Sequence, residues 1–336
     1  MKRALIGLVA LLGTVGVLVA CATVLIRKPL NHAPASQRAA AAASVRASQS
    51  AGTKSTPKSD CKGVERKPAG RYLGFASSSS VAATLSAFTR VTGSKPTITQ
   101  LYIRFGTAFP TEEACRVAAD GALPVVQIDP RGVSLKSIAK SDRWTGYLER
   151  YGEAIRAFGM PVAIGFAHEA DGSWYQWGCS HTPAAQFVAA WHRLYNGVGA
   201  SHLPNAIWVW TVSSRIRTAS CSLSSLWPGA SYVTWIGLDG YLRSAHATFG
   251  STFGPAIGDV RSFSTKPVLI TEAGVDNVPT QPAQIGALLR AADVYPGVLG
   301  MIYFDSAAIS DYRPQDNPAS LAAFRDAATL YLKPGS

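Results

Sequence analysis

Short apolar runs alternate with longer amphipathic stretches along the chain from residue 71 onward. Eight runs, beginning at residues 72, 101, 123, 161, 206, 232, 267 and 298, have the length and continuous apolar character of buried parallel strands. Apolar residues spaced by three and four predict a helix over 144–158, ended by Gly159, and another over 183–195, capped by Thr182. Eight such βα units predict a (β/α)8 TIM barrel spanning residues 71–336, with its active site at the C-terminal ends of the strands.

A doubly wound open sheet is the alternative α/β architecture for this alternation. It is disfavoured because no glycine-rich phosphate loop follows the first predicted strand.

Residues 1–28 join a short basic start to an apolar run from Ala4 to Ile26, which predicts a signal peptide or a membrane anchor. Leu18 to Cys21 resembles the lipobox of bacterial lipoproteins, in which the cysteine is lipidated. The run also continues past Cys21 for long enough to form an uncleaved anchor, and plain secretion is the third alternative. Each places the rest of the chain outside the cytoplasm, either secreted or tethered to the outer face of the cell membrane. The membrane is therefore expected as a partner only through this N-terminal segment.

Residues 29–70 are rich in Ala, Ser, Lys and Pro and predict a disordered linker. Residues 1–70 hold 11 Lys and Arg against 2 Asp and Glu, so they supply +9 of the formal charge of +12. The remainder, with 21 basic and 18 acidic residues, carries only +3. Because the predicted barrel lacks a basic stripe, we expect no nucleic-acid partner. We also expect the protein to be a monomer.

Four cysteines lie beyond the first segment, at positions 61, 115, 179 and 221. An even number in an exported protein predicts two disulfides, for which three pairings exist. We favour Cys179–Cys221, because both follow neighbouring strands at one rim, and Cys61–Cys115 as the remainder. No CxxC or HxxxH spacing is present, so neither a metal nor another cofactor is predicted.

Acidic and aromatic residues gather where the predicted strands end. Glu169 follows the fourth strand, in the segment HEADGSWYQWG, and Glu272 follows the seventh, in KPVLITEAG. Two carboxylates facing each other across a barrel mouth are the apparatus of glycoside hydrolysis, and nearby aromatic rings can serve as platforms for sugars. Further candidates at the mouth are Arg104, Trp210, Asp239, Tyr241 and Phe304.

These two segments resemble glycoside hydrolase family 26, best known for β-mannanases, over roughly residues 71–332. The resemblance implies a retaining (β/α)8 hydrolase with Glu169 as general acid/base and Glu272 as nucleophile. It also implies substrate-binding roles for His168, Trp174, Trp177 and Tyr241. We expect Tyr241, with Arg104 nearby, to stabilise charged Glu272, and we expect Glu169 to begin the reaction protonated.

The chain departs from the family pattern at two positions, with Asp171 where Asn is usual and Gly165 where Arg is usual. The second change alters the wall near the proximal sugar, so β-mannan, β-glucan and β-xylan all remain candidate substrates. Two other functions stay open: a catalytically silent carbohydrate-binding or cell-wall protein, and a transglycosylase of the cell envelope.

Overall fold

The computed structural model describes residue 61 and residues 71–215, 221–307 and 310–332. The predicted signal or anchor, the lipobox cysteine Cys21 and the linker apart from Cys61 lie outside the described residues. Within the described part of the chain, no helix is both long enough and apolar enough to cross a membrane.

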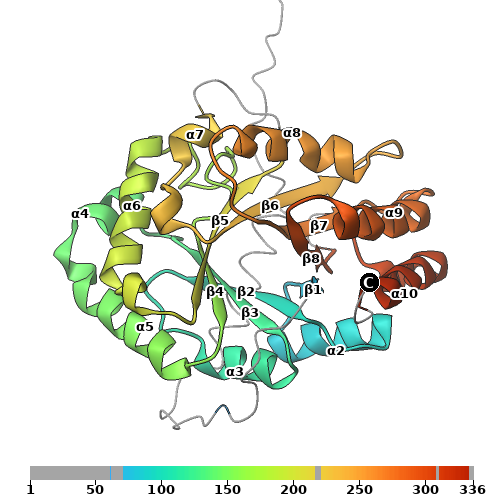
Figure 1. Cartoon of the computed structure of the whole chain (residues 1–336), viewed down its shortest axis with the longest axis horizontal. Helices are drawn as coiled ribbons and strands as arrows, with labels where there is room; N and C mark the ends of the chain where they lie inside the picture. The colour runs from blue at the N-terminus through green and yellow to red at the C-terminus, as the bar shows by residue number, and fades with distance from the viewer. Residues whose placement is uncertain (1–60, 62–70, 216–220, 308–309, 333–336) are drawn as a thin grey trace, which may run out of the picture. The chain divides into compact units, whose positions relative to one another are not determined.

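Eight parallel strands form a closed barrel, in which each strand pairs with the next and β1 pairs with β8 (Figure 1). The predicted TIM barrel is thereby confirmed. The strands are β1 (Tyr72–Ala76), β2 (Ile98–Arg104), β3 (Leu123–Asp129), β4 (Val162–Phe166), β5 (Ala206–Ser213), β6 (Trp235–Leu242), β7 (Val268–Val275) and β8 (Val298–Phe304).

Helices connect the strands and surround the barrel (Figure 1). They are α2 (Val81–Thr92), α3 (Thr111–Ala119), α4 (Leu135–Lys140), α5 (Thr145–Phe158), α6 (Ala184–Gly197), α7 (Leu223–Leu226), α8 (Phe249–Arg261), α9 (Gln281–Val294) and α10 (Pro318–Tyr331). The short 3-10 turns are Asp142–Trp144, Ala200–His202, Ala230–Tyr232 and Pro314–Asp316.

Two of the predicted helix ends can be compared directly with the structure. Helix α5 ends at Gly159, as predicted, because this residue adopts a left-handed φ of 71°. The predicted cap of α6 is wrong by one residue: Pro183 is the N-cap, and the Thr182 hydroxyl donates to the carbonyl of Gln176.

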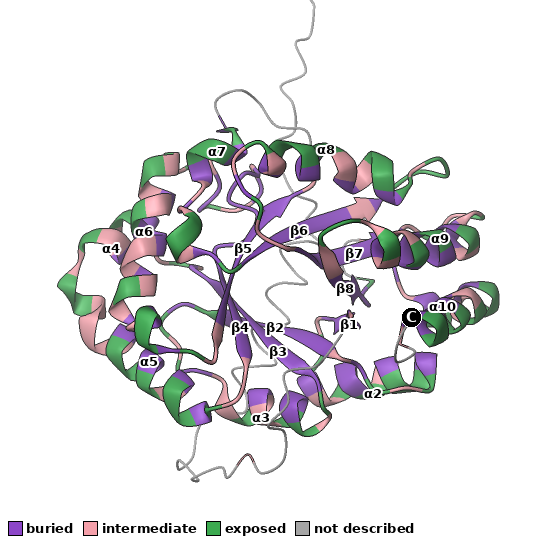
Figure 2. Cartoon of the chain, viewed as in Figure 1, coloured by how far each residue is buried: buried purple, intermediate pink, exposed green. Residues whose placement is uncertain are grey.

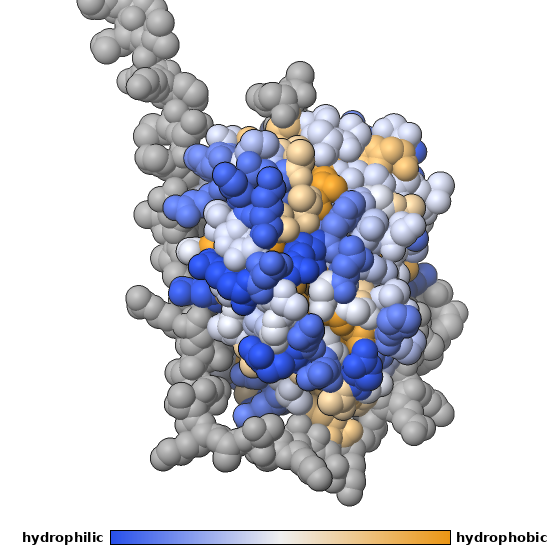
Figure 3. Space-filling model, turned by 90° about the vertical axis from the view of Figure 1, so that its left-hand side faces the viewer, coloured by the Kyte–Doolittle hydropathy of each residue, from blue (hydrophilic) through white to orange (hydrophobic). Residues whose placement is uncertain are grey.

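The main apolar core lies between the strands and the helices, where buried strand residues meet the inner faces of the helices (Figure 2). On β1, Phe75 packs against Phe88 of α2 and Phe324 of α10, with ring centroids 5.0 and 5.4 Å apart. On the side that carries α4 and α6, the surface is mostly hydrophilic, with small separate apolar areas (Figure 3).

The inside of the barrel is polar, in contrast to this outer core. Thr211 and Thr271 approach Gly237 from the two neighbouring strands, and a Cβ at Gly237 would lie 2.3 Å from one hydroxyl and 2.9 Å from the other. Likewise, a Cβ at Gly165 would lie 2.0 Å from Oε1 of Gln127. Gln127 of β3 thus occupies the space beside Gly165, which explains why this chain carries no Arg there.

Both favoured disulfides are present in the structure. Cys179 and Cys221 join the loops after β4 and β5, with Cα atoms 5.9 Å apart, and Cys61 joins Cys115 of α3, with Cα atoms 5.4 Å apart. The first bridge fixes the long loop that follows β4 to the rim of the barrel.

Candidate active site

Glu169 lies three residues beyond the end of β4, on an unusual backbone. Both Ala167 and Glu169 have left-handed φ angles, of 48° and 53°, which cost on the order of 1–3 kcal/mol each in residues other than glycine. Hydrogen bonds to the neighbouring strands hold this turn: the N–H of Glu169 donates to the carbonyl of Thr211 at 3.0 Å, and that of Ala167 to Ile128 at 2.9 Å. The strained turn directs the Glu169 carboxyl into the site.

The Glu169 carboxyl is 7% exposed, and its Oε2 accepts a 2.6 Å hydrogen bond from the indole N–H of Trp174. Burial raises the pKa of Glu169 to about 7, and repulsion from Glu272 adds to this effect. His168 and the Trp174 N–H act in the opposite direction, because both favour the charged carboxylate. Glu169 can therefore hold or release a proton near neutral pH.

Glu272 lies within β7 and is 6% exposed. One carboxylate oxygen accepts a hydrogen bond from the hydroxyl of Tyr102 on β2, and the other accepts one from Tyr241 on β6. Two donors on one carboxylate stabilise its charged form and fix its orientation. The expected contact with Tyr241 is thus present, whereas Tyr102 was missed by the sequence analysis.

Arg104, which was expected near Glu272, is exposed at the C-terminal end of β2. Tyr102, two residues earlier on the same strand, is the β2 side chain that contacts Glu272. Gln100 in turn donates to the Tyr102 hydroxyl at 2.7 Å, so two residues of β2 support the carboxylate.

His168 is buried and belongs to a chain of polar contacts. Its Nδ1 lies 3.0 Å from Asp129 at the end of β3, and its Nε2 lies 3.2 Å from the Tyr175 hydroxyl. Burial alone would lower the pKa of His168, but Asp129 outweighs it and raises this pKa to about 9. His168 is therefore a buried cation close to both glutamates. Asp129 also ends a strand, so the search for acidic residues at strand ends that identified Glu169 could have found it as well.

Asp239 of β6 is a third buried carboxyl at the mouth. Its Oδ1 accepts a hydrogen bond from the Thr271 hydroxyl at 2.5 Å. Burial raises the pKa of Asp239 well above its usual range, and repulsion from Glu272 and Glu169 adds to the increase. Burial and the neighbouring carboxyls thus favour the neutral form of Asp239.

The loop aromatics, expected as sugar platforms, are largely buried. Trp174 and Trp177 are only 8% and 4% exposed. The indole of Trp177 stacks on Tyr175 with centroids 4.3 Å apart and donates to the carbonyl of His168 at 2.8 Å. Their substrate-binding role stays a prediction, and in this structure both rings are largely covered by protein. Both rings support the His168–Glu169 turn.

The last two candidates lie in different environments. Trp210 is fully buried outside the barrel wall and packs on Trp227 and Phe263, so its expected contact with substrate is wrong. Phe304, at the end of β8, lies 6.2 Å from the ring of Tyr241 and therefore belongs to the mouth.

One group of side chains could accommodate a cation. Potential ligand atoms of His168, Glu169 and Asp239 lie within 4.8 Å of one another. Each residue already has a protein partner, namely Asp129, Trp174 and Thr271 respectively. These contacts fit a proton-handling site better than a metal centre.

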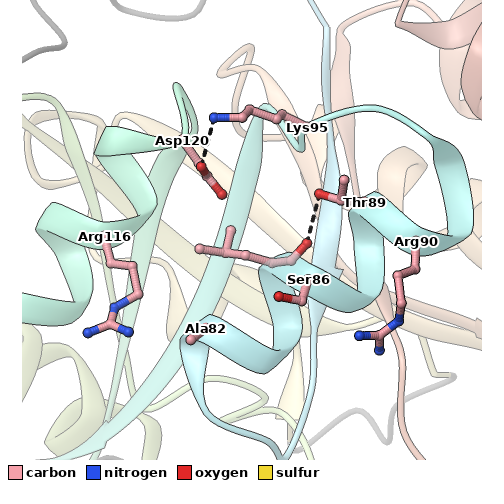
Figure 4. Close-up of a pocket in the computed structure, with 8 residues that line it drawn as sticks. Ala82, Ser86, Thr89, Arg90, Lys95, Arg116 and Asp120 are labelled. Carbon is pink, nitrogen blue, oxygen red and sulfur yellow. Dashed lines mark hydrogen bonds and ion pairs between the residues drawn. The ribbon is translucent and has the colours of Figure 1, made fainter.

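A groove of about 670 Å³ opens between α2 and α3, outside the barrel (Figure 4). Its acid, Asp120, is paired with Lys95 at 2.9 Å, and no second carboxylate lines it among the described residues. The groove lacks the paired acids found at the mouth, so the mouth is the candidate active site.

A parallel eight-stranded barrel that brings two buried carboxyls to its mouth, one after β4 and one within β7, is typical of glycoside hydrolases. The family model described as glycosyl hydrolase family 26 matches residues 136–254, a segment that includes Glu169 and Tyr241, while Glu272 lies beyond it. This match confirms the resemblance to glycoside hydrolase family 26 that the sequence indicated.

Individual relatives are similar at lower identity. Endoglucanase H of Acetivibrio thermocellus is 24% identical over 260 residues, covering 72% of this chain and 28% of that protein. A mannan endo-1,4-beta-mannosidase of Bacillus subtilis is 24% identical over 164 residues, covering 45% of this chain and 41% of that protein. The chain thus spans less than half the length of these curated relatives.

Solved structures show the same fold. The catalytic domain of a Bacillus sp. endo-beta-1,4-mannanase superposes with a TM-score of 0.59 at 14% identity, covering 78% of this chain and 86% of that one. A modular endo-beta-1,4-mannanase from Cellulomonas fimi gives a TM-score of 0.58 at 18% identity, covering 79% and 71%.

Proposed function

We propose that this protein is a retaining glycosidase that cleaves β-linked polysaccharide through a covalent glycosyl-enzyme. The observation that carries this proposal is the unequal environment of the two glutamates. Glu169 is buried with a pKa of about 7, whereas Glu272 accepts hydrogen bonds from two tyrosine hydroxyls. One group is suited to donate a proton and the other to remain an anion.

In the first step, Glu272 attacks the anomeric carbon while Glu169 gives its proton to the glycosidic oxygen. The carbon–oxygen bond breaks, the shortened chain leaves as an alcohol, and the sugar remains as an ester on Glu272. Tyr102 and Tyr241 hold the attacking carboxylate in place. His168, a cation beside both carboxyls, offsets part of their negative charge.

In the second step, Glu169 is the base. It takes a proton from water as the water oxygen attacks the anomeric carbon, and Glu272 leaves as a carboxylate. Two inversions give net retention, which requires carboxyl groups about 5–5.5 Å apart rather than the roughly 6.5–9.5 Å of inverting enzymes. This separation is a prediction for a crystal structure.

The proposed substrate class rests on the match to the family 26 model and on the relatives. A β-mannan is the first candidate, because mannanases occur among the curated relatives and among the similar structures. Endoglucanase H among the relatives supports β-glucan as a second candidate. Gly165 stands where Arg is usual, and Gln127 fills the space beside it, which is the feature of this chain that bears on the choice.

Azide rescue tests the two roles. Glu169→Ala should retain glycosylation by an activated aryl β-glycoside and accumulate the intermediate, because no base activates water. Azide needs no such base, so it should restore turnover and give the β-glycosyl azide. Glu272→Ala should be nearly inactive on every substrate and give only α-azide. A β-azide from Glu272→Ala together with an α-azide from Glu169→Ala would reverse the assignment.

We further propose that the enzyme works outside the cytoplasm. Both disulfides support this location, because such bridges persist in oxidising compartments. Replacing Cys21 with Ala tests the tether: loss of lipid labelling in the native host would support a lipoprotein. A membrane-retained protein with an intact Met1 would support the anchor instead.

A further inference from the structure

Two arginines follow neighbouring strands at the mouth and cover the aromatic rings that hold the two catalytic carboxyls. Arg215, after β5, lies over the ring of Trp174 at 4.7 Å, and Trp174 donates to Glu169. Arg243, directly after β6, lies over Tyr241 at 5.2 Å, and Tyr241 donates to Glu272. Each guanidinium therefore lies one ring away from a catalytic carboxyl.

Both arginines lie close to the same part of the mouth. Tyr312 stacks on Tyr241 with centroids 4.7 Å apart. Burial raises the pKa of Tyr312, while Arg243 and Arg215 act to lower it, so both charges reach this ring. The negative charges of Glu272 and Asp276 act on the same hydroxyl and raise its pKa. The arginines and the nucleophile thus surround one stacked pair of tyrosines.

Two other arginines at the mouth have carboxylate partners in the protein itself. Arg131 pairs with Asp129 at 3.2 Å, and Arg313 pairs with both Asp311 and Asp316. Arg215 and Arg243 are exposed, and no ion pair joins either to another described residue. A guanidinium stacked on an aromatic ring keeps its N–H groups at the edge, free to bind an oxyanion in bidentate fashion.

Two of the neighbouring acids, Asp239 and Glu169, offset these charges less than exposed carboxylates would. Burial favours the neutral form of Asp239 and raises the pKa of Glu169 to about 7. The exposed Arg104 at the end of β2 adds a further positive charge to the same rim. A mouth built to bind an uncharged sugar chain has no need for unpaired arginines beside its catalytic carboxyls.

We propose that Arg215 and Arg243 form a subsite for an anionic sugar, so that the substrate is a β-linked glycan carrying carboxylate, sulfate or phosphate groups. This inference rests on the proposed glycosidase function and narrows its substrate class. The open ring edges and the position beside Glu169 and Glu272 place the anionic group on a sugar next to the cleaved bond.

Binding to matched hexasaccharides tests the inference. The full chain carrying Glu169→Gln is titrated calorimetrically with β-1,4-mannohexaose, with the hexamer of β-1,4-mannuronate, and with 6-O-sulfated mannohexaose. We expect either anionic hexamer to bind at least about tenfold more tightly than the neutral one, since charge-assisted hydrogen bonds are the strong class. The anionic hexamer that binds more tightly shows whether the subsite prefers carboxylate or sulfate. The advantage should shrink near 1 M salt, where the Debye length is about 3 Å.

Variants assign the effect to the two arginines. Adding Arg215→Gln or Arg243→Gln should each reduce the preference for the anionic hexamer by about tenfold. The control Arg156→Gln, an exposed arginine in the last turn of α5 at the opposite end of the barrel, should leave the preference unchanged.

Equal or weaker binding of both anionic hexamers would overturn the inference, as would an anionic preference that survives both substitutions. Neither result would contradict the proposed function, which is tested separately by azide rescue on an uncharged aryl glycoside. Failure of that rescue, with an anionic preference intact, would reject the mechanism but keep the anion subsite.

Discussion

The ends of β4 and β7 each present a glutamate to the same mouth, but they hold it by opposite means. Glu169 lies beyond its strand, on a turn with two left-handed residues, and is supported by an aromatic loop tied down by Cys179–Cys221. Glu272 lies inside β7, where the pairing with both neighbouring strands shifts register, and is held by tyrosines of β2 and β6. The loop-supported carboxyl is the one whose pKa is tuned to about 7. The barrel wall therefore fixes the proposed nucleophile, and the loop adjusts the proposed acid/base.

The largest expected difference between the two regions is in leaving-group dependence. Glu272→Gln should lower kcat by at least about 10⁴-fold on every glycoside, because no nucleophile remains. Glu169→Gln should cause a comparable loss only with polymer, and a much smaller one in the glycosylation of aryl glycosides with good leaving groups. Pre-steady-state kinetics on a series of aryl leaving groups measures this. Parallel losses for both variants across the series would contradict the division of roles.

The disulfide that supports the Glu169 region can be compared with the one that does not. Closing loops of 42 and 54 residues is worth on the order of 3–4 kcal/mol in each case. Replacing Cys179 and Cys221 with Ser should lower both the free energy of unfolding and kcat. Replacing Cys61 and Cys115 should lower only the free energy of unfolding. Denaturant titration and steady-state kinetics on the two double variants measure these effects. An unchanged kcat in the variant without Cys179–Cys221 would mean that the loop keeps its geometry without the bridge.

The raised pKa of Glu169 predicts a cost in stability with a defined sign. The unfolded chain releases this proton near pH 4.5 and the folded protein near 7, so this group lowers the free energy of unfolding as pH rises through that window. Glu169→Gln should therefore be more stable than the parent at pH 8, by about 3 kcal/mol, and similar at pH 4. Thermal unfolding at both pH values measures it. An equal effect at both would mean that the change arises from packing instead of charge.

The smallest expected effect separates two tryptophans of the same loop. Trp174→Phe removes the N–H that stabilises charged Glu169, so the pKa of Glu169 should rise and the alkaline limb of the kcat/KM profile should move to higher pH. Trp177→Phe removes a donor to a backbone carbonyl and should leave that limb in place. An equal shift of the alkaline limb in both variants would indicate that each substitution disturbs the loop as a whole.

The sequence predicted the number and order of the strands because continuous apolar runs mark buried parallel strands. It did not reveal which face of a strand a residue occupies. Trp210 was expected at the mouth but points to the helices, and Tyr102 was not singled out although it binds Glu272. A strand that is apolar on both faces carries no alternation to separate them, and a shift of one residue reverses the assignment.

Glu169 and Glu272 themselves were found because a charged residue at the end of an apolar strand stands out. The support around them was not found, since it depends on contacts between distant segments. Tyr102 lies 170 residues from Glu272 in the chain. The burial of Trp174 and Trp177 also follows from how the loop folds back on His168, which the aromatic spacing does not encode.

Trapping the covalent intermediate tests the central claim most directly. The parent protein is incubated with an activated 2-deoxy-2-fluoro-β-mannoside and, in parallel, with the matching glucoside, because the fluorine slows breakdown of the glycosyl-enzyme. Peptide mass spectrometry then locates the label. The proposed mechanism predicts one fluorosugar on the peptide containing Glu272, and none in Glu272→Gln. A label on Glu169 would contradict the assignment, and turnover of the unmodified glycoside to a product of inverted configuration without any label would contradict the retaining mechanism.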